Sequence, residues 1–333
     1  IIGGLLLILL AAFSLWFNNS NSMQAEGATA AKVYFDGEYR IANGEWQPIE
    51  AGKHISTTKG DVTLRINFHL MDPDGNPMDD MERTVPIALY TDHIGLTFYS
   101  GGKKVRVIDN ENPIIGESAC GESWTMHAVK TGGAEPIEIV VHNPHRFGNE
   151  SAIDEMLSSV EIWANMDFEK DVLSNGEPQR NAGLLLMLVS LVFLGIALFS
   201  SLIHIKNNKI IWLLGAVVLF AGAYVAYSAD GVSFWSESIV SNTTILGASM
   251  MFYMLFLLMI IAYLLKTTKK IANCTVILLG AATAVFFILS IITDVYFYDM
   301  WLWWIAIQLV ANVVFVACLI KEFITTNGKE RWL

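Results

Sequence analysis

The sequence has little cysteine and contains no recognisable catalytic motif. Only Cys120 lies outside the long apolar runs, since Cys274 and Cys318 fall within them, so no disulfide is expected in the water-soluble part. A glycine-rich phosphate loop, a nucleophile elbow and a paired His-Glu zinc helix are all missing from the sequence. We therefore predict that this chain is not an enzyme and holds no cofactor.

Basic residues are scarce as well. The chain has 21 Lys and Arg against 32 Asp and Glu, a formal net charge of −11, and residues 18–180 alone hold 13 basic and 26 acidic residues. A nucleic-acid-binding protein needs a basic face. The composition therefore argues against nucleic acid as a partner.

Charge is missing altogether from five apolar stretches in the second half of the chain. Each has about 20 residues or slightly more, and a helical rise of about 1.5 Å per residue makes that enough to cross a hydrocarbon core of about 30 Å. We predict five membrane-spanning helices, surrounded by the lipid bilayer, at Asn181–Ile205, Ile210–Ala229, Thr243–Leu265, Ile271–Thr293 and Trp301–Ile320.

The connections between these stretches sort by the sign of their charge. Lysines mark the first and third connections and the C-terminal tail, whereas the second and fourth connections hold aspartate or glutamate and no basic residue. Basic connections are typically cytoplasmic. We therefore predict a multi-pass membrane protein with a cytoplasmic C-terminus and with residues 18–180 outside the cytoplasm.

These patterns divide the chain into five parts. Residues 1–17 form an apolar run that we interpret as a membrane anchor, with a cleaved signal peptide as the alternative. The other parts are an exterior domain (18–165), a juxtamembrane linker (166–181), the five-span bundle (182–320) and a cytoplasmic tail (321–333). A chain that opens without Met and closes on so short a tail is expected to be a fragment of a longer protein.

Short alternating runs fill the exterior segment. In Asp61–Leu70 apolar and polar residues alternate strictly, which is typical of a strand buried on one face. Tyr34–Tyr39 is interpreted as a hairpin with an Asp-Gly turn. Regular strands without intervening helices predict an antiparallel β-sandwich. The further strands are predicted at Val85–Tyr90, Ile94–Tyr99, Val105–Ile108 and Ile137–Val141.

Nearer the first span the apolar spacing becomes helical. Ser151 followed by Asp154 is a capping signal, and the apolar residues after it repeat on one helix face. We predict a helix there, then another turn or two at Asp167–Leu173 that ends at Ser174-Asn175-Gly176. The residues expected to couple the exterior domain to the spans are Asp154, Met156, Leu157 and Phe168.

Aromatic and histidine side chains are the candidate ligand-binding groups. Aromatic rings stack on the apolar faces of sugars, although sandwich cores also need large aromatics. The histidine pair around Pro144 has no nearby cysteine and no helix to align it, so no metal site is expected. The candidate residues are Trp46, Tyr90, Tyr99, Trp124, His142 and His145.

Two amides interrupt the last apolar stretch. Gln308 and Asn312 lie four residues apart, where lipid cannot satisfy their hydrogen bonds, so we predict bonds between helices. No charged residue lies deep within any stretch, which argues against an ion-coupled transporter.

The order of these parts resembles the 7TM-DISM family, bacterial seven-transmembrane receptors with diverse intracellular signalling modules. Tyr34–Arg40, Ile108–Gly116 and Val141–Asn149 are similar to the N-terminal regions of membrane-bound GGDEF proteins of gut Firmicutes. The resemblance implies a jelly-roll exterior domain, a small-molecule ligand for which a sugar is one candidate, a homodimer, and a cytoplasmic diguanylate cyclase as output. The chain departs from that family in having five of the seven spans and no Gly-Gly-Asp-Glu-Phe segment.

Two other functions remain as alternatives. A surface-tethered carbohydrate-binding protein would use the spans only as an anchor, although one span suffices for that purpose. A membrane transporter or transferase subunit would be expected to carry buried charges. The sequence therefore favours a transmembrane signal receptor in a bacterial cell membrane.

Overall fold

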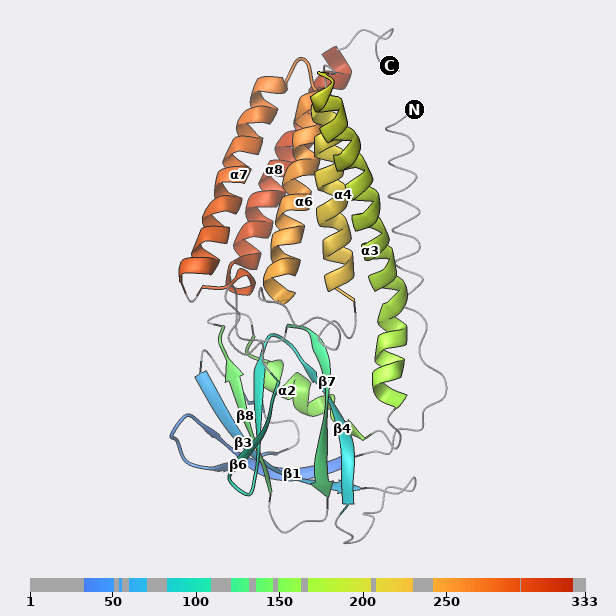
Figure 1. Ribbon diagram of the computed structural model, residues 1–333. Helices are drawn as coiled ribbons and strands as arrows, with labels where there is room; N and C mark the ends of the chain where they lie inside the picture. Colours follow the sequence, from blue (N-terminus) through green and yellow to red (C-terminus); the bar gives the residue numbers. More distant parts are fainter. Residues whose placement is uncertain are drawn as a thin grey trace.

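The chain folds into a β-sandwich followed by five long helices, with the sandwich at one end of the helices (Figure 1). The predicted anchor, residues 1–17, lies outside the part of the chain that the structure describes, as do 71–82 and the end of the tail. The computed structural model describes residues 33–50, 54–55, 60–70, 83–108, 121–131, 136–145, 149–162, 167–204, 208–229, 242–293 and 295–325.

The larger sheet has six antiparallel strands in the order β2-β1-β3-β8-β5-β6. Its alternating pattern buries Leu64 and Ile66 of β3 and turns Arg65 between them to the outer face. The strands predicted at Asp61–Leu70, Ile94–Tyr99, Val105–Ile108 and Ile137–Val141 all lie in this sheet and are confirmed. The bounds are β1 (Val33–Ile41), β2 (Gln47–Pro48), β3 (Gly60–Leu70), β5 (Gly95–Ser100), β6 (Lys103–Ile108) and β8 (Ile137–Asn143).

The smaller sheet has the order β7-β4-β9, with β4 at Arg83–Thr91, β7 at Ser123–Thr131 and β9 at Glu161–Ile162. Ile87, Leu89 and Val129 from this sheet share one buried apolar cluster with the larger sheet, which confirms the predicted β-sandwich. Strand β7 was not predicted. Its buried positions include the polar Thr125 and His127, which interrupt the alternation of hydrophobicity.

Strand β1 runs straight through Asp36-Gly37, so the hairpin predicted at Tyr34–Tyr39 is wrong. The Asp36 carboxylate accepts a hydrogen bond from Asn67 Nδ2 in β3 at 3.0 Å. A Cβ on Gly37 would lie 2.1 Å from the carbonyl oxygen of Arg65. The close approach of two strands therefore explains the glycine better than a turn does.

The helix predicted after Ser151 is α2 (Ala152–Ser158), which buries Met156 and Leu157 in the sandwich core. The predicted cap is wrong, because Ser151 makes no side-chain bond to the helix backbone and its Oγ donates to Glu155 Oε1 at 2.7 Å. Asp154 instead accepts the backbone N–H of Ile55 at 3.0 Å. The acidic residue thus fixes a distant segment rather than the helix end.

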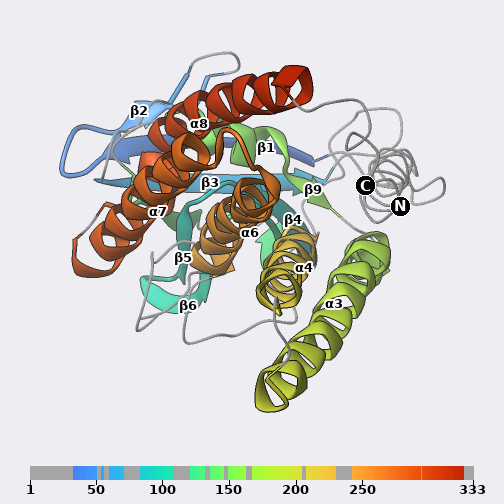
Figure 2. The ribbon, with the colours of Figure 1, turned by 90° about the horizontal axis from the view of Figure 1, so that it is seen from above.

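All five long helices have the length and composition to cross a membrane, as predicted. They lie side by side, with α3 at one side and α7 and α8 at the other (Figure 2). Leu188, Val192 and Phe199 are each more than 60% exposed, a state that suits lipid and not water. The chain is therefore a multi-pass membrane protein. The bounds are α3 (Asp167–Leu202), α4 (Lys209–Tyr227), α6 (Asn242–Leu264), α7 (Lys269–Ile292) and α8 (Phe297–Thr325).

Helix α3 continues through Ser174-Asn175-Gly176 and Pro178, so the helix end predicted there is wrong. Proline removes one backbone hydrogen bond from a helix. The turn that follows is held from outside, because Gln179 Nε2 donates to the carbonyl oxygen and the Oγ of Ser228 after α4, at 3.0 and 2.9 Å. The predicted linker is therefore helical from Asp167 onward and leads into the first span without a break.

His127 gives the sandwich a specific acid sensitivity. Its ring is buried, with its centroid 4.1 Å from that of Phe98. Burial, and then the positive charge of Arg106, lower the pKa of His127 from 6.5 to about 4. Between these two values the unfolded chain binds a proton that the folded chain does not, so stability is full above about pH 6.5 and falls as the pH drops toward 4.

We expect His127→Gln to reduce this loss. The melting temperature of the full chain in nanodiscs, measured from pH 7.5 to 4.5, should fall less steeply for His127→Gln than for the wild type. The control His142→Gln changes an exposed histidine of the same domain and should keep the wild-type slope. Equal slopes for the wild type and His127→Gln would show that the buried ring does not set the acid sensitivity.

Candidate functional site: the junction of the sandwich and the helices

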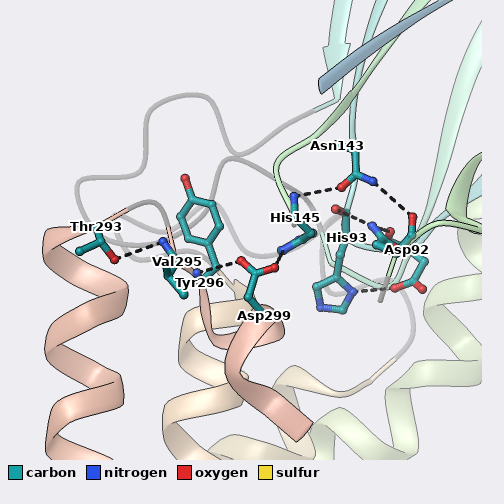
Figure 3. A network of polar contacts seen from close by, with 9 residues as sticks. Asp92, His93, Asn143, His145, Thr293, Val295, Tyr296 and Asp299 are labelled. Atoms are coloured by element: carbon teal, nitrogen blue, oxygen red, sulfur yellow. Dashed lines mark hydrogen bonds and ion pairs between the residues drawn. The ribbon is translucent and has the colours of Figure 1, made fainter. Parts of the chain in front are cut away.

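The sandwich meets the helices through two loops, the turn between β4 and β5 and the segment after β8 (Figure 3). Buried asparagines connect them. Asn149 Nδ2 donates to the carbonyl oxygen of Asp92 at 3.0 Å, and Asn143 Nδ2 donates to the carbonyl oxygen of Asn149 at 3.2 Å. Asn143 Oδ1 in turn accepts the backbone N–H of His145 at 3.0 Å. The position of His145 is therefore fixed by hydrogen bonds that reach the other loop.

The helices present the start of α8 to these loops. Asp299 Oδ2 accepts the backbone N–H of Tyr296 at 3.2 Å, which closes the first turn. A carboxylate at this position also suits the positive end of the helix dipole. Phe297 is buried together with Met251 and Trp304 of the helices. The start of α8 is thus anchored in the helix layer.

His145 and Asp299 join the two sides of the junction (Figure 3). Nδ1 of His145 lies 3.6 Å from Oδ1 of Asp299, and the two side chains are 0% and 2% exposed. This distance is too long for a hydrogen bond, and it is within the range of an ion pair when His145 is protonated. The Tyr298 ring packs against both histidines of the junction, with centroid distances of 4.6 Å to His145 and 4.3 Å to His93. Exclusion of water strengthens the electrostatic interaction between the two sides.

Two residues with left-handed backbone shape the contact. His93 has a φ of 51°, which is uncommon for a residue with a Cβ, and its Nδ1 lies 2.6 Å from Asp92 Oδ1. Gly121, just before β7, has a φ of 74°. A Cβ there would lie 2.5 Å from Thr243 Cγ2 near the start of α6, so glycine is needed for this approach.

A second polar cluster closes the opposite end of α8. The Glu322 carboxylate accepts the backbone N–H groups of Lys266, Thr267 and Thr268 at 3.0, 2.8 and 3.2 Å. These three residues connect α6 to α7. Asp299 and Glu322 are about 35 Å apart along α8 at about 1.5 Å per residue. This one helix therefore links the junction to the far end of the layer.

The outer face of the larger sheet holds two of the predicted ligand residues. The Trp46 ring lies 3.9 Å from the Arg65 guanidinium carbon and 4.7 Å from that of Arg40. Arg65 Nε donates to Glu138 Oε1 at 2.8 Å, and this bond raises the pKa of Arg65. Tyr99 lies opposite Glu138 in the neighbouring strand. Trp46 and Tyr99 thus belong to one row of polar and aromatic side chains.

The other four predicted ligand residues lie elsewhere. Tyr90 and Trp124 are register partners on the smaller sheet, with their rings 5.6 Å apart and edge to face. His142 is exposed, and its Nδ1 lies 2.6 Å from Asp61 Oδ1. His145 is buried in the junction. The six residues occupy separate places, so one small molecule cannot contact them all.

The residues predicted to couple the domains, and the two amides predicted to bond between helices, do not make the contacts expected of them. Met156 and Leu157 belong to the sandwich core, and Phe168 lies in the first turn of α3, with a side chain outside the described set. Gln308 Nε2 donates to Asn312 Oδ1 at 3.0 Å, a bond within α8 and not between helices as predicted. Sequence reasoning used Asp299 only to orient the chain, and no periodicity indicated its pairing with His145.

Comparisons of the chain with protein-family models, with curated proteins and with solved structures find no match. Within the residues that the structure describes, no group of three His, Cys, Asp or Glu side chains is arranged to hold a metal ion.

Proposed function

We propose that this chain is the sensor part of a transmembrane signal receptor. The sandwich binds a small molecule outside the cell, and the helices relay its state to a cytoplasmic output domain, for which a GGDEF diguanylate cyclase is our candidate. The observation that carries the proposal is the buried pair of His145 and Asp299, which ties the sandwich to a helix that crosses the layer. A protein that uses its helices only as a membrane anchor needs no such pair.

Two connections serve the relay. One is covalent, since β9 pairs with β4 and the chain then enters α3. The other is the junction, since His93 follows β4 closely and packs against Tyr298 of α8. A ligand changes a switch only through its different affinities for the two states. A ligand that favours one position of β4 would therefore bias α8 and the loop that Glu322 holds.

We place the ligand on the outer face of the larger sheet, along the row from Trp46 to Tyr99. Glu38, Arg65 and Glu138 alternate in charge between them on adjacent strands. Strands lie about 4.8 Å apart, so the row is about 14 Å long. Its hydrogen-bond donors and acceptors, with the Trp46 ring against Arg65 and Tyr99 at one end, suit a polyhydroxylated ligand such as a sugar.

The experiment uses the full chain in nanodiscs and a library of glycans and small metabolites. Binding compounds are found by thermal shift, and hydrogen exchange is then measured with each of them. We expect a ligand that slows exchange in β3 and β8 to change exchange also at residues 266–268, which Glu322 binds at the far end. Protection confined to the sandwich would contradict the receptor and favour a surface-tethered carbohydrate-binding protein.

A further inference from the structure

Asn312 carries an amide on a surface of α8 that faces lipid. It lies near the middle of this 29-residue helix, and its side chain is exposed. Ile305, two turns before it on the same face, and Val316, one turn after it, are 39% and 55% exposed. A polar group facing hydrocarbon without a partner is unfavourable, because lipid offers no hydrogen bonds.

The bond between Gln308 and Asn312 leaves half of each amide unused. Gln308 Nε2 donates to Asn312 Oδ1, while the buried Oε1 of Gln308 has no hydrogen-bond partner in the described part of the chain. Turning both amides over exchanges donor and acceptor but still leaves one half of each amide unpaired. The Gln308 oxygen is buried in its own copy, so the exposed amide of Asn312 is the half of the pair that a second chain can complete.

The surroundings of α8 indicate what completes it. Figure 2 shows α8 along one side of the helices, with no other described helix beyond it. A second copy inserted in the same membrane has the same orientation, so its α8 is parallel and its Asn312 lies at the same depth. A two-fold axis beside α8 then brings the two amides opposite each other. An amide is both donor and acceptor, so it is complementary to itself.

We propose that two copies of this chain pair through α8, with Nδ2 of Asn312 in each copy donating to Oδ1 of Asn312 in the other. The apolar residues at helical spacing around Asn312, including Ile305 and Val316, would pack against the second helix. This pairing depends on the placement of α8 in the membrane and not on the receptor role. It would put two cytoplasmic ends side by side.

Cross-linking tests the pairing in native membranes. Cys120, Cys274 and Cys318 are first replaced by alanine, and Asn312→Cys or Val310→Cys is then introduced. Val310 is a matched control, because it is 64% exposed at nearly the same depth but lies about 160° away around the helix. We expect a short thiol cross-linker to give a species of twice the 36.9 kDa chain mass with Asn312→Cys and little of it with Val310→Cys.

A second measurement tests the pairing in variants that carry no introduced cysteine. Dimerisation in nanodiscs or liposomes, measured by single-molecule photobleaching, should weaken about threefold to tenfold in Asn312→Leu, in line with the modest strength of amide bonds between membrane helices. Asn312→Gln should retain the pairing. Three results would each overturn the proposal. They are equal cross-linking at both positions, a cross-linked product whose mass indicates a different partner, and photobleaching that finds one copy of the wild-type chain per particle.

Discussion

Asp299→Ala is expected to lower the free energy of unfolding by about 1 to 3 kcal/mol, since it removes the buried carboxylate that faces the imidazole of His145. His145 and Asp299 are both almost fully buried, so water cannot replace the lost carboxylate. The substitution also removes the acceptor of the Tyr296 N–H in the first turn of α8. Asp299→Asn keeps an acceptor for that N–H and should cost less.

The measurement is thermal unfolding in nanodiscs followed by tryptophan fluorescence. Asp61→Ala is the matched control, because Asp61 also pairs with a histidine, at 2.6 Å, but with side chains 57% and 45% exposed. Exposed pairs contribute about 0 to 1 kcal/mol. If Asp299→Ala and Asp61→Ala have the same small effect, the junction does not hold the sandwich on the helices.

Gly183→Leu is expected to separate α3 from α4. A Cβ on Gly183 would lie 2.4 Å from the backbone nitrogen of Ala226 and 2.6 Å from the carbonyl oxygen of Gly222. Backbone atoms of a helix cannot move aside individually, so the helices must part. Overpacking of this kind costs about 1 to 3 kcal/mol or more. Because α3 carries the covalent connection from the sandwich, we expect the proposed relay through this helix to fail as well.

Gly195→Leu is the matched control on the same helix, since a Cβ at Gly195 meets nothing within 4 Å. Leucine has a higher helix propensity than glycine, so this variant should be as stable as the wild type or slightly more stable. The melting temperature and the monodisperse fraction after extraction distinguish the two variants. Similar losses in both would mean that the α3–α4 contact does not depend on the absence of a side chain at Gly183.

The regular parts of the fold were predictable because they follow periodicity. The five spans appear as uncharged runs, and β3 appears as strict alternation, both of which report burial or lipid contact directly. Predictions failed where tertiary contacts override local signals. Asp36-Gly37 is a turn signal, yet Asp36 bonds to Asn67 across the sheet. Gly176 and Pro178 are breakers, yet Gln179 holds α3 against the end of α4.

The junction could not be predicted from the sequence, because it too depends on tertiary contacts. His93, His145 and Asp299 come from three distant segments, and only the folded sandwich brings them together on the helices. His145 has the same residue type as His142, which lies three positions earlier, near the end of β8. One is buried and the other is exposed, and no local pattern distinguishes them.

The junction contacts predict that the sandwich and α8 stabilise each other, and hydrogen exchange on the membrane-embedded chain tests this most directly. In His145→Ala we expect exchange to become about tenfold faster or more, both near Asn143 and in the first turns of α8, residues 297–304. The control His142→Ala should leave α8 at the wild-type rate. Faster exchange confined to the sandwich in His145→Ala, with α8 unchanged, would contradict the coupling.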